Sequence, residues 1–386
     1  MNDLLASLKS TLAQLVAIDS TSARSNERVI EYLQERLRPL GFALKLQTYL
    51  DDAGVRKTNL IATIAGDGSQ PVELALVGHT DCVPYDSAWK EALLLEERDG
   101  RLYGRGACDT KAFIAAAITA AGRVEPLKPL ALVFTADEEL GCVGAKQLVD
   151  AKAVRARYAI VGEPTSLAPV RANKGYCLAE IEIGGKEGHS AYPDTGASAI
   201  YRAARFIRRI EELSAELRSE TDASFEPPFT TVNVGTLSGG KAKNIIPGSC
   251  RFHVEWRPIP GQSPKHVFSR LEDIGKELKS EDAGFSARID LLRQDNGAQS
   301  APDSPIVRFI ADQSGKEPTT VPFGTEAGHL AALGAETVVF GPGNIQFAHR
   351  TGEFVPIDEL VRAEAILERA IIAFCSGRQR LKVEQG

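Results

Sequence analysis

The stretch A-L-V-F-T-A-D-E-E-L-G-C-V-G-A, residues 131–145, joins an apolar run to three consecutive acidic residues. Residues 131–134 predict a buried strand, which Asp137, Glu138 and Glu139 follow almost directly. Neighbouring carboxylates repel one another, and a buried charge without a partner is costly. The cluster therefore indicates that a positive charge lies at the end of this strand, and bound cations would supply it.

The chain has 386 residues, more than one compact core usually contains, so two domains are expected. Hydrophobic residues make up 43% and charged residues 25%, as is typical of a soluble globular protein. The formal net charge is -6, and the basic residues are dispersed among acidic ones. These features exclude the basic surface that nucleic-acid binding requires.

No apolar run approaches the ~18 residues that span a bilayer, so no membrane partner is expected. The amino-terminal segment carries Asp3 and Lys9 among leucines at helical spacing, which is typical of an amphipathic helix and not of a secretory signal. No two of the six cysteines form a C-x-x-C pair, as expected of free thiols in a reducing cytosol: Cys82, Cys108, Cys142, Cys177, Cys250 and Cys375. We therefore expect a cytoplasmic protein.

Apolar strands alternate with helical patterns in the first part of the chain. The runs 59–66, 72–81, 131–139 and 158–164 predict buried strands, and residues 110–124 predict a helix between two of them. Another buried strand is expected at 337–344 and a closing helix at 356–376. This alternation predicts an α/β domain in which helices cover a sheet.

The middle of the chain has a different pattern. Between residues 176 and 292, strand and helix patterns follow in the order β-α-β-β-α-β. This order is that of a ferredoxin-like sandwich. We therefore expect residues 176–292 to form an inserted domain, with residues 1–175 and 293–386 as a discontinuous first domain.

Several strands of the first domain end in residues that bind metals. These residues are His79 and Asp81, Glu138 and Glu139, Glu163, and His349 after a short loop, while Asp109 stands at a helix start. Ligands of open α/β sheets bind outside the carboxyl ends of the strands, so these side chains are expected to converge on a metal site. Taken singly, each has an ordinary explanation, such as a helix cap for Asp109. His329 competes with His349 as the last ligand, and the residues alone leave this choice open.

Five ligands are too many for one tetrahedral zinc ion but suit two ions that share a bridging carboxylate. Glu138 and Glu139 are consecutive, so one can bind metal while the other takes a proton from water. This arrangement predicts a metal-dependent hydrolase. A non-catalytic, metal-dependent binding protein is the alternative from another class, although such a protein has no need of an unligated base.

Four motifs, G-H-T-D-C-V-P, G-R-G-A-C-D-T-K, T-A-D-E-E-L-G-C-V-G-A and G-E-P-T, occur in order from residue 78 to 165. With them the whole chain resembles the di-zinc family of aminoacylases, succinyl-diaminopimelate desuccinylases and acetylornithine deacetylases. The resemblance implies a zinc-peptidase-like catalytic domain with a mixed sheet and two Zn²⁺ per subunit, for which Co²⁺ or Mn²⁺ could substitute. It places His79, Asp109 and Glu163 at one metal, and Asp109, Glu139 and His349 at the other. Glu138 becomes the general base, Asp81 orients His79, and a non-proline cis peptide follows Asp109.

The resemblance also implies that the inserted domain forms a homodimer and contributes to the site. His189, in K-E-G-H-S-A-Y-P-D-T-G, would reach a neighbouring active site and stabilise the oxyanion. Asn244 and Arg257 match positions that bind the substrate carboxylate. Without the resemblance, an exposed loop histidine and a solvent-facing arginine would be the ordinary interpretations.

Residues 322–355 most resemble the acetylornithine deacetylase branch of the family. That resemblance implies hydrolysis of an N-acyl amino acid, above all of N2-acetyl-L-ornithine to L-ornithine and acetate in arginine biosynthesis. Gly324, Thr325 and Glu326 would then contact the substrate, with Glu326 pairing with its cationic side chain. Thr110 stands where many relatives have Met, which loosens this assignment. A desuccinylase and a dipeptidase of the same family stay open, because the shape of the acyl pocket is not visible in the sequence.

Overall fold

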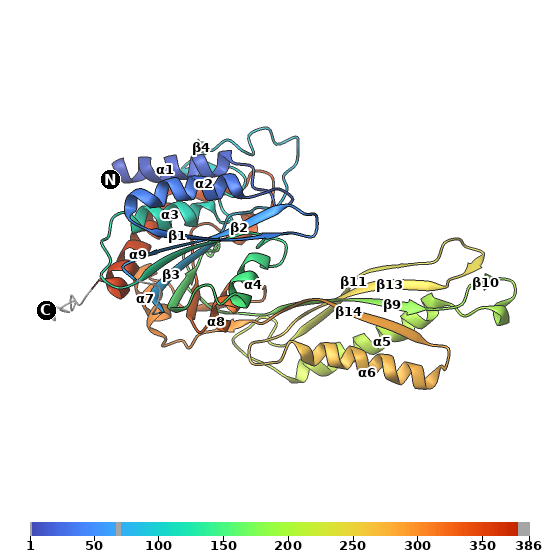
Figure 1. Ribbon diagram of the computed structural model, residues 1–386. Helices are drawn as coiled ribbons and strands as arrows, with labels where there is room; N and C mark the ends of the chain where they lie inside the picture. The colour runs from blue at the N-terminus through green and yellow to red at the C-terminus, as the bar shows by residue number, and fades with distance from the viewer. Residues whose placement is uncertain (1, 67–70, 377–386) are drawn as a thin grey trace. The chain divides into compact units, whose positions relative to one another are not determined.

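The computed structural model describes residues 2–66 and 71–376 (Figure 1). The chain divides into two compact units, the first made of Met1–Ala172, Gln299–Thr319 and His329–Gly386, the second of Asn173–Ala298 and Thr320–Gly328. The sequence predicted an insertion at 176–292. The second unit instead runs from 173 to 298, and it also includes a later segment, 320–328. Met1 and residues 377–386 of the expected first domain lie outside the described residues.

A mixed sheet of nine strands organises the first unit. Its centre consists of four neighbouring parallel strands, β6 (Leu130–Thr135), β3 (Val72–His79), β7 (Ala156–Val161) and β17 (Glu336–Val339). The order continues through β2 (Arg56–Ile64) to β1 (Ala43–Leu50) on one side, and through β8 (Val170–Asn173) to β15 (Ala298–Gln299) on the other, with β16 (Thr319–Val321) paired to β8. The mixed sheet predicted from the sequence is confirmed.

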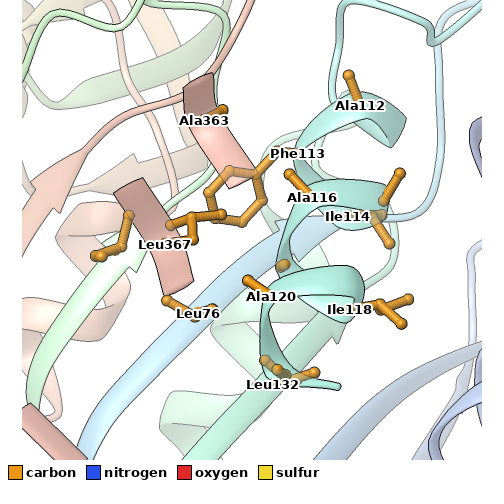
Figure 2. Close-up of a cluster of buried hydrophobic side chains, with 14 of the residues drawn as sticks. Leu76, Ala112, Phe113, Ile114, Ala116, Ile118, Ala120, Leu132, Ala363 and Leu367 are labelled. Atoms are coloured by element: carbon orange, nitrogen blue, oxygen red, sulfur yellow. The ribbon is translucent and has the colours of Figure 1, made fainter. Parts of the chain in front are cut away.

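The central strands are apolar on both faces because helices cover both. Helix α3 (Lys111–Ala121) is buried along its whole length and packs against α9 (Ile357–Cys375). Figure 2 shows Phe113 of α3 beside Ala363 and Leu367 of α9, with Leu76 of β3 in the same core cluster. The small side chains of this alanine-rich helix permit close packing, which fixes the loop that precedes α3.

The remaining elements of the first unit lie around this sheet. Its other helices are α1 (Asn2–Ala17), α2 (Glu27–Leu37), α4 (Val143–Asp150) and α7 (Pro305–Ser314), while α8 (Ala327–Ala332) begins in the second unit and ends in the first. A separate three-stranded sheet contains β4 (Glu96–Arg98), β5 (Arg101–Tyr103) and β18 (Phe354–Pro356). Strands β18 and β5 pair antiparallel, which brings the residues before β18 next to the loop after β5.

The second unit has the predicted β-α-β-β-α-β order. Its strands β9 (Tyr176–Gly184), β11 (Thr231–Gly239), β13 (Ser249–Arg257) and β14 (Ser286–Asp295) form an antiparallel sheet in the order β11-β13-β9-β14. Burial alternates along β9 and β13, and the buried face packs against α5 (Ala199–Glu216) and α6 (Lys265–Glu281) (Figure 1). The ferredoxin-like topology is therefore confirmed. A separate two-stranded antiparallel sheet pairs β10 (Gly188–His189) with β12 (Ile245–Ile246).

Two further observations concern the environment of the protein. Among residues 2–66 and 71–376, no helix combines the length and the apolar character needed to cross a membrane. All six cysteines are buried and free of disulfide bonds.

Candidate metal centre

The predicted ligands lie at one edge of the central sheet. Strand β3 ends at His79, while β6 and β7 lead directly to Glu139 and Glu163. Strand β17 leads through residues 340–348 to His349. Because these four strands are parallel neighbours, their carboxyl ends meet, and the predicted convergence of strand ends is what the structure shows.

Asp109 lies between the two predicted histidine ligands. Its Oδ1 is 3.0 Å from Nε2 of His79, and its Oδ2 is 3.0 Å from Nε2 of His349. His349 Nε2 is also 3.1 Å from Oε1 of Glu139. The potential ligand atoms of His79, Asp109 and Glu163 lie within 4.8 Å of one another, and so do those of Asp109, Glu139 and His349. The structure thus brings together two ligand sets that share one carboxylate.

The electrostatics of this cluster fit two divalent cations. Hydrogen bonds with Asp109 and Glu139 raise the pKa of His349 to about 10. Burial lowers the pKa of His79, but contacts with Asp109 and Asp81 outweigh it, so that pKa is also raised. The neighbouring carboxylates thus favour positive charge at this point of the cluster. When ionised, the four carboxylates of Asp109, Glu138, Glu139 and Glu163 carry four negative charges, which two divalent ions would balance.

Asp81 contacts the loop after β6 as well as His79, whereas the sequence indicated the contact with His79 alone. The Nδ1 of His79 lies 3.0 Å from the main-chain oxygen of Asp81, which can only accept, so Nδ1 donates, and in the neutral ring Nε2 carries the lone pair that could bind a metal. The Asp81 carboxylate is 3.6 Å from that nitrogen. This carboxylate accepts from the main-chain nitrogens of Glu138 (3.1 Å) and Glu139 (3.3 Å), and from the Ser22 hydroxyl. Asp81 therefore also fixes the loop that carries the predicted base and a predicted ligand.

The three consecutive acids after β6 have different partners. Asp137 is buried in a left-handed backbone conformation, with φ of 55°. Its Oδ1 lies 2.8 Å from Nζ of the buried Lys57, and its Oδ2 accepts from the Tyr49 hydroxyl at 3.0 Å. Glu138 accepts a hydrogen bond from the Cys142 thiol at 3.4 Å. The positive charge that the sequence led us to expect is thus, for Asp137, a lysine and not a metal.

The loop before α3 is held from two sides. The peptide bond between Asp109 and Thr110 is cis, as the resemblance implied, and the Thr110 hydroxyl donates to the main-chain oxygen of Gly162 at 3.0 Å. A Cβ at Gly162 would lie 2.2 Å from the ring of Phe113, so only glycine allows α3 to approach the end of β7 this closely. On the other side, the main chain of Asp109 contacts Glu353, a residue that nothing in the sequence singled out.

Three predicted site residues of the second unit, His189, Asn244 and Arg257, are at least partly exposed. His189, on β10, is exposed, and its Nδ1 accepts from the main-chain nitrogen of Ala191 at 3.1 Å. Asn244 is exposed just before β12, and its main-chain oxygen accepts from the main-chain nitrogen of Ser190, so the pairing of β10 with β12 brings Asn244 near His189. Arg257 ends β13, where its guanidinium contacts Glu255 and the Tyr176 ring.

The segment 324–329 contains the remaining candidates. Thr325 Oγ1 accepts from the main-chain nitrogen of Ala327 at 3.2 Å, at the start of α8. The Glu326 side chain is buried, and Gly324 is partly buried beside Tyr176. Among the described residues, His329 takes part in none of the potential ligand groups, whereas His349 does.

Comparison with known proteins identifies relatives along the whole chain. The model of peptidase family M20/M25/M40 matches residues 75–373. The chain is 60% identical over 380 residues to an acetylornithine deacetylase of Myxococcus xanthus, covering 98% of this chain and all of the relative. It is 34% identical to an acetylornithine deacetylase of Proteus mirabilis, covering 97% of this chain and 98% of the relative.

Among solved structures, a tripeptidase from Staphylococcus aureus has the same fold, with a TM-score of 0.76 and 23% identity over 97% of this chain and 99% of the other. The match of the family model and the identity with full-length relatives agree with the motifs and with the two ligand sets that share Asp109. The chain belongs to peptidase family M20/M25/M40.

Proposed function

We propose that the protein hydrolyses N2-acetyl-L-ornithine to L-ornithine and acetate, a reaction of arginine biosynthesis. The observation that carries this proposal is the pair of ligand sets joined by Asp109, with Glu138 beside them. The acetyl and ornithine groups are proposed on the strength of the 60% identity to a relative that bears this activity in its name.

In this mechanism His79, Asp109 and Glu163 would hold one divalent metal, and Asp109, Glu139 and His349 a second. When bound, the metals would acidify a water molecule and polarise the amide carbonyl of the substrate. Glu138 takes a proton from the attacking water on its carboxylate and gives it to the amide nitrogen as the C–N bond breaks. Asp81 keeps Glu138 in place, because its carboxylate accepts the main-chain N–H of that residue.

We further propose that His189 stabilises the oxyanion of the substrate, acting from a second subunit of a homodimer. Its Nδ1 accepts a hydrogen bond, so the proton of the neutral ring is on Nε2, which is then a donor. His189 is also exposed, as a residue that acts on another molecule must be. The dimer itself is proposed from the resemblance of the inserted domain.

Substrate recognition is proposed to involve Arg257 and Asn244 at the carboxylate of the substrate. Arginine suits this role because its planar guanidinium can donate two parallel hydrogen bonds. Gly324 and Thr325 would contact the substrate, and Glu326 would pair with its ammonium group. Unchanged Michaelis constants for ornithine substrates in a Glu326→Gln variant would contradict the role of Glu326.

Zinc is the proposed metal, since imidazole and carboxylate ligands suit it, and cobalt or manganese would substitute. A cytoplasmic location is proposed from the free thiols of all six cysteines.

The decisive experiment is hydrolysis by the zinc-loaded protein of N-acetylornithine, N-acetylmethionine, N-succinyl-diaminopimelate and a plain dipeptide. We expect the highest kcat/KM for N-acetylornithine. A preference for the succinyl substrate or the dipeptide would assign the protein to another branch of the family. Metal binding without turnover of any of the four would favour the non-catalytic alternative.

A further inference from the structure

A buried carboxylate outside the ligand sets holds the main chain of the shared ligand. Oε1 of Glu353 accepts hydrogen bonds from the main-chain nitrogens of Cys108 (2.9 Å) and Asp109 (3.0 Å). Its other oxygen, Oε2, accepts from Nη1 of Arg105. The Glu353 residue is only 1% exposed. One side chain thus satisfies two consecutive N–H groups at the point where Asp109 projects toward both histidines.

The arginine that neutralises Glu353 is itself fixed. Arg105 is 2% exposed, its Nη2 donates to the main-chain oxygen of Pro84 at 3.3 Å, and its guanidinium lies over the Trp89 ring. The main-chain nitrogen of Arg105 donates to Ala92 at 2.7 Å. These contacts hold the guanidinium of Arg105 in place, and its ion pair with Glu353 in turn holds the carboxylate against the 108–109 backbone.

Glu353 is also close in the chain to His349, the second histidine of the ligand sets. His349 is four residues before Glu353, and it has a left-handed backbone with φ of 59°. The main-chain nitrogen of Glu353 donates to the oxygen of Arg350, and its main-chain oxygen accepts from Gly104. The pairing of β18 with β5 continues directly after these contacts. Glu353 is therefore tied both to the segment that carries His349 and to the loop that carries Asp109.

We propose that Glu353 is a positioning residue for the ligand set of Asp109, Glu139 and His349, and that the affinity of this set for its metal depends on it. The inference rests on the proposed two-metal function. Partners behind the ligands of metal sites fix ligand orientation, and their loss typically weakens metal affinity about 10–100-fold. Here the partner acts on the backbone of one ligand and on the loop of another.

The test compares Glu353→Gln with Glu364→Gln as a matched control. Gln keeps the volume of Glu353, but its NH2 group must face either Arg105 or the two main-chain N–H groups, all of which are donors. Glu364 is a fully buried acid of α9 whose ion-pair partner is Arg123, so its replacement alters a buried carboxylate outside the ligand sets. Zn²⁺ affinity is measured by competition with a chromogenic chelator, and the Co²⁺ forms are compared by visible absorption.

We expect Glu353→Gln to bind one of its two ions about 10–100-fold more weakly and to shift the Co²⁺ spectrum. Glu364→Gln should match the wild type in both. Wild-type affinity and spectrum in Glu353→Gln would overturn the inference alone, whereas a wild type that binds only one ion would overturn the two-metal proposal with it. If Glu353→Gln does not fold, Arg105→Lys decides, and an unchanged affinity in that variant overturns the inference.

Discussion

The candidate residues of the two units differ in how they are held. In the first unit, His79, Asp109 and Glu163 are buried, and buried ion pairs support the loops around them. In the second unit, His189 and Asn244 are exposed and are placed by the short pairing of β10 with β12. Metal ligands must be held in place before the metal arrives, whereas groups that meet a substrate must be accessible. Substitutions of the buried ligands and of their supporting residues in the first unit should therefore affect stability or metal binding, and those at exposed positions of the second should affect activity alone.

The largest effect is expected at the base, which has no metal-binding role in the proposed mechanism. Replacing Glu138 with Gln should lower kcat by roughly 10²–10⁴-fold, because proton transfer by a positioned base contributes that much. The metal content, measured by atomic absorption, should stay at two ions per subunit. Loss of metal together with activity would show that Glu138 is a ligand, and the proposed division of labour with Glu139 would be wrong.

The second prediction concerns the buried Lys57–Asp137 ion pair, which supports the loop that carries Glu138 and Glu139. Replacing Lys57 with Met leaves the Asp137 carboxylate buried without its cation, which should lower the free energy of unfolding by about 3–5 kcal/mol. Urea unfolding followed by circular dichroism measures this change. The double variant Lys57→Met with Asp137→Asn is the control, and it should recover much of the loss. A double variant as unstable as Lys57→Met would show that the pair is not the cause.

His189 tests the accessible part of the second unit. Replacing it with Ala should lower kcat by about 10²–10³-fold, the usual effect of losing one oxyanion donor. The thermal midpoint should not change, because the side chain is exposed. Replacement of the exposed Lys276 of α6, which pairs with Asp273, by Ala serves as the control and should leave kcat unaffected. A fall in the thermal midpoint for His189→Ala would contradict the expectation that exposed positions of the second unit affect activity alone.

The smallest effect is expected for the pH dependence of stability at Glu364. This residue is a buried acid of the first unit that lies outside the ligand sets, so it tests burial without metal binding. Burial raises the pKa of Glu364 from its ordinary 4.5 to about 7, so the folded protein binds this proton more tightly than the unfolded chain. The resulting stability is complete below pH 4.5 and is lost as the pH rises through 7. Between pH 5 and 8, the wild type should lose on the order of 1–3 kcal/mol relative to Glu364→Gln, measured by urea unfolding. Equal losses in both proteins would contradict the raised pKa.

The convergence of the ligands could be predicted from the sequence because it follows from the sheet. Apolar strands that end in His79, Glu139 and Glu163 have their carboxyl ends on one edge when they are parallel neighbours. The family and the α/β fold with its ferredoxin-like insertion are also confirmed. They could be predicted because both depend on local sequence patterns that follow one another in a fixed order.

The supporting residues could not be predicted in this way. Glu353 contacts Asp109 from 244 positions away, and Lys57 contacts Asp137 from 80 positions away, so no local pattern marks either pair. The contacts of the Asp81 carboxylate with main-chain nitrogens depend on the shape of the 137–139 loop, which residue types do not specify. The roles of His189, Asn244 and Arg257 in the reaction stay predictions.

The absence of a side chain at Gly162 couples the packing of the core to the position of the candidate metal ligands. The ring of Phe113 fills the space where a Cβ at that position would stand, directly before Glu163 in the chain. The carbonyl of Gly162 also receives the hydroxyl of Thr110, next to Asp109. Attempts to stabilise the protein by repacking α3 will therefore alter its catalytic properties, and variants selected for altered catalysis can arise at core positions that contact no substrate.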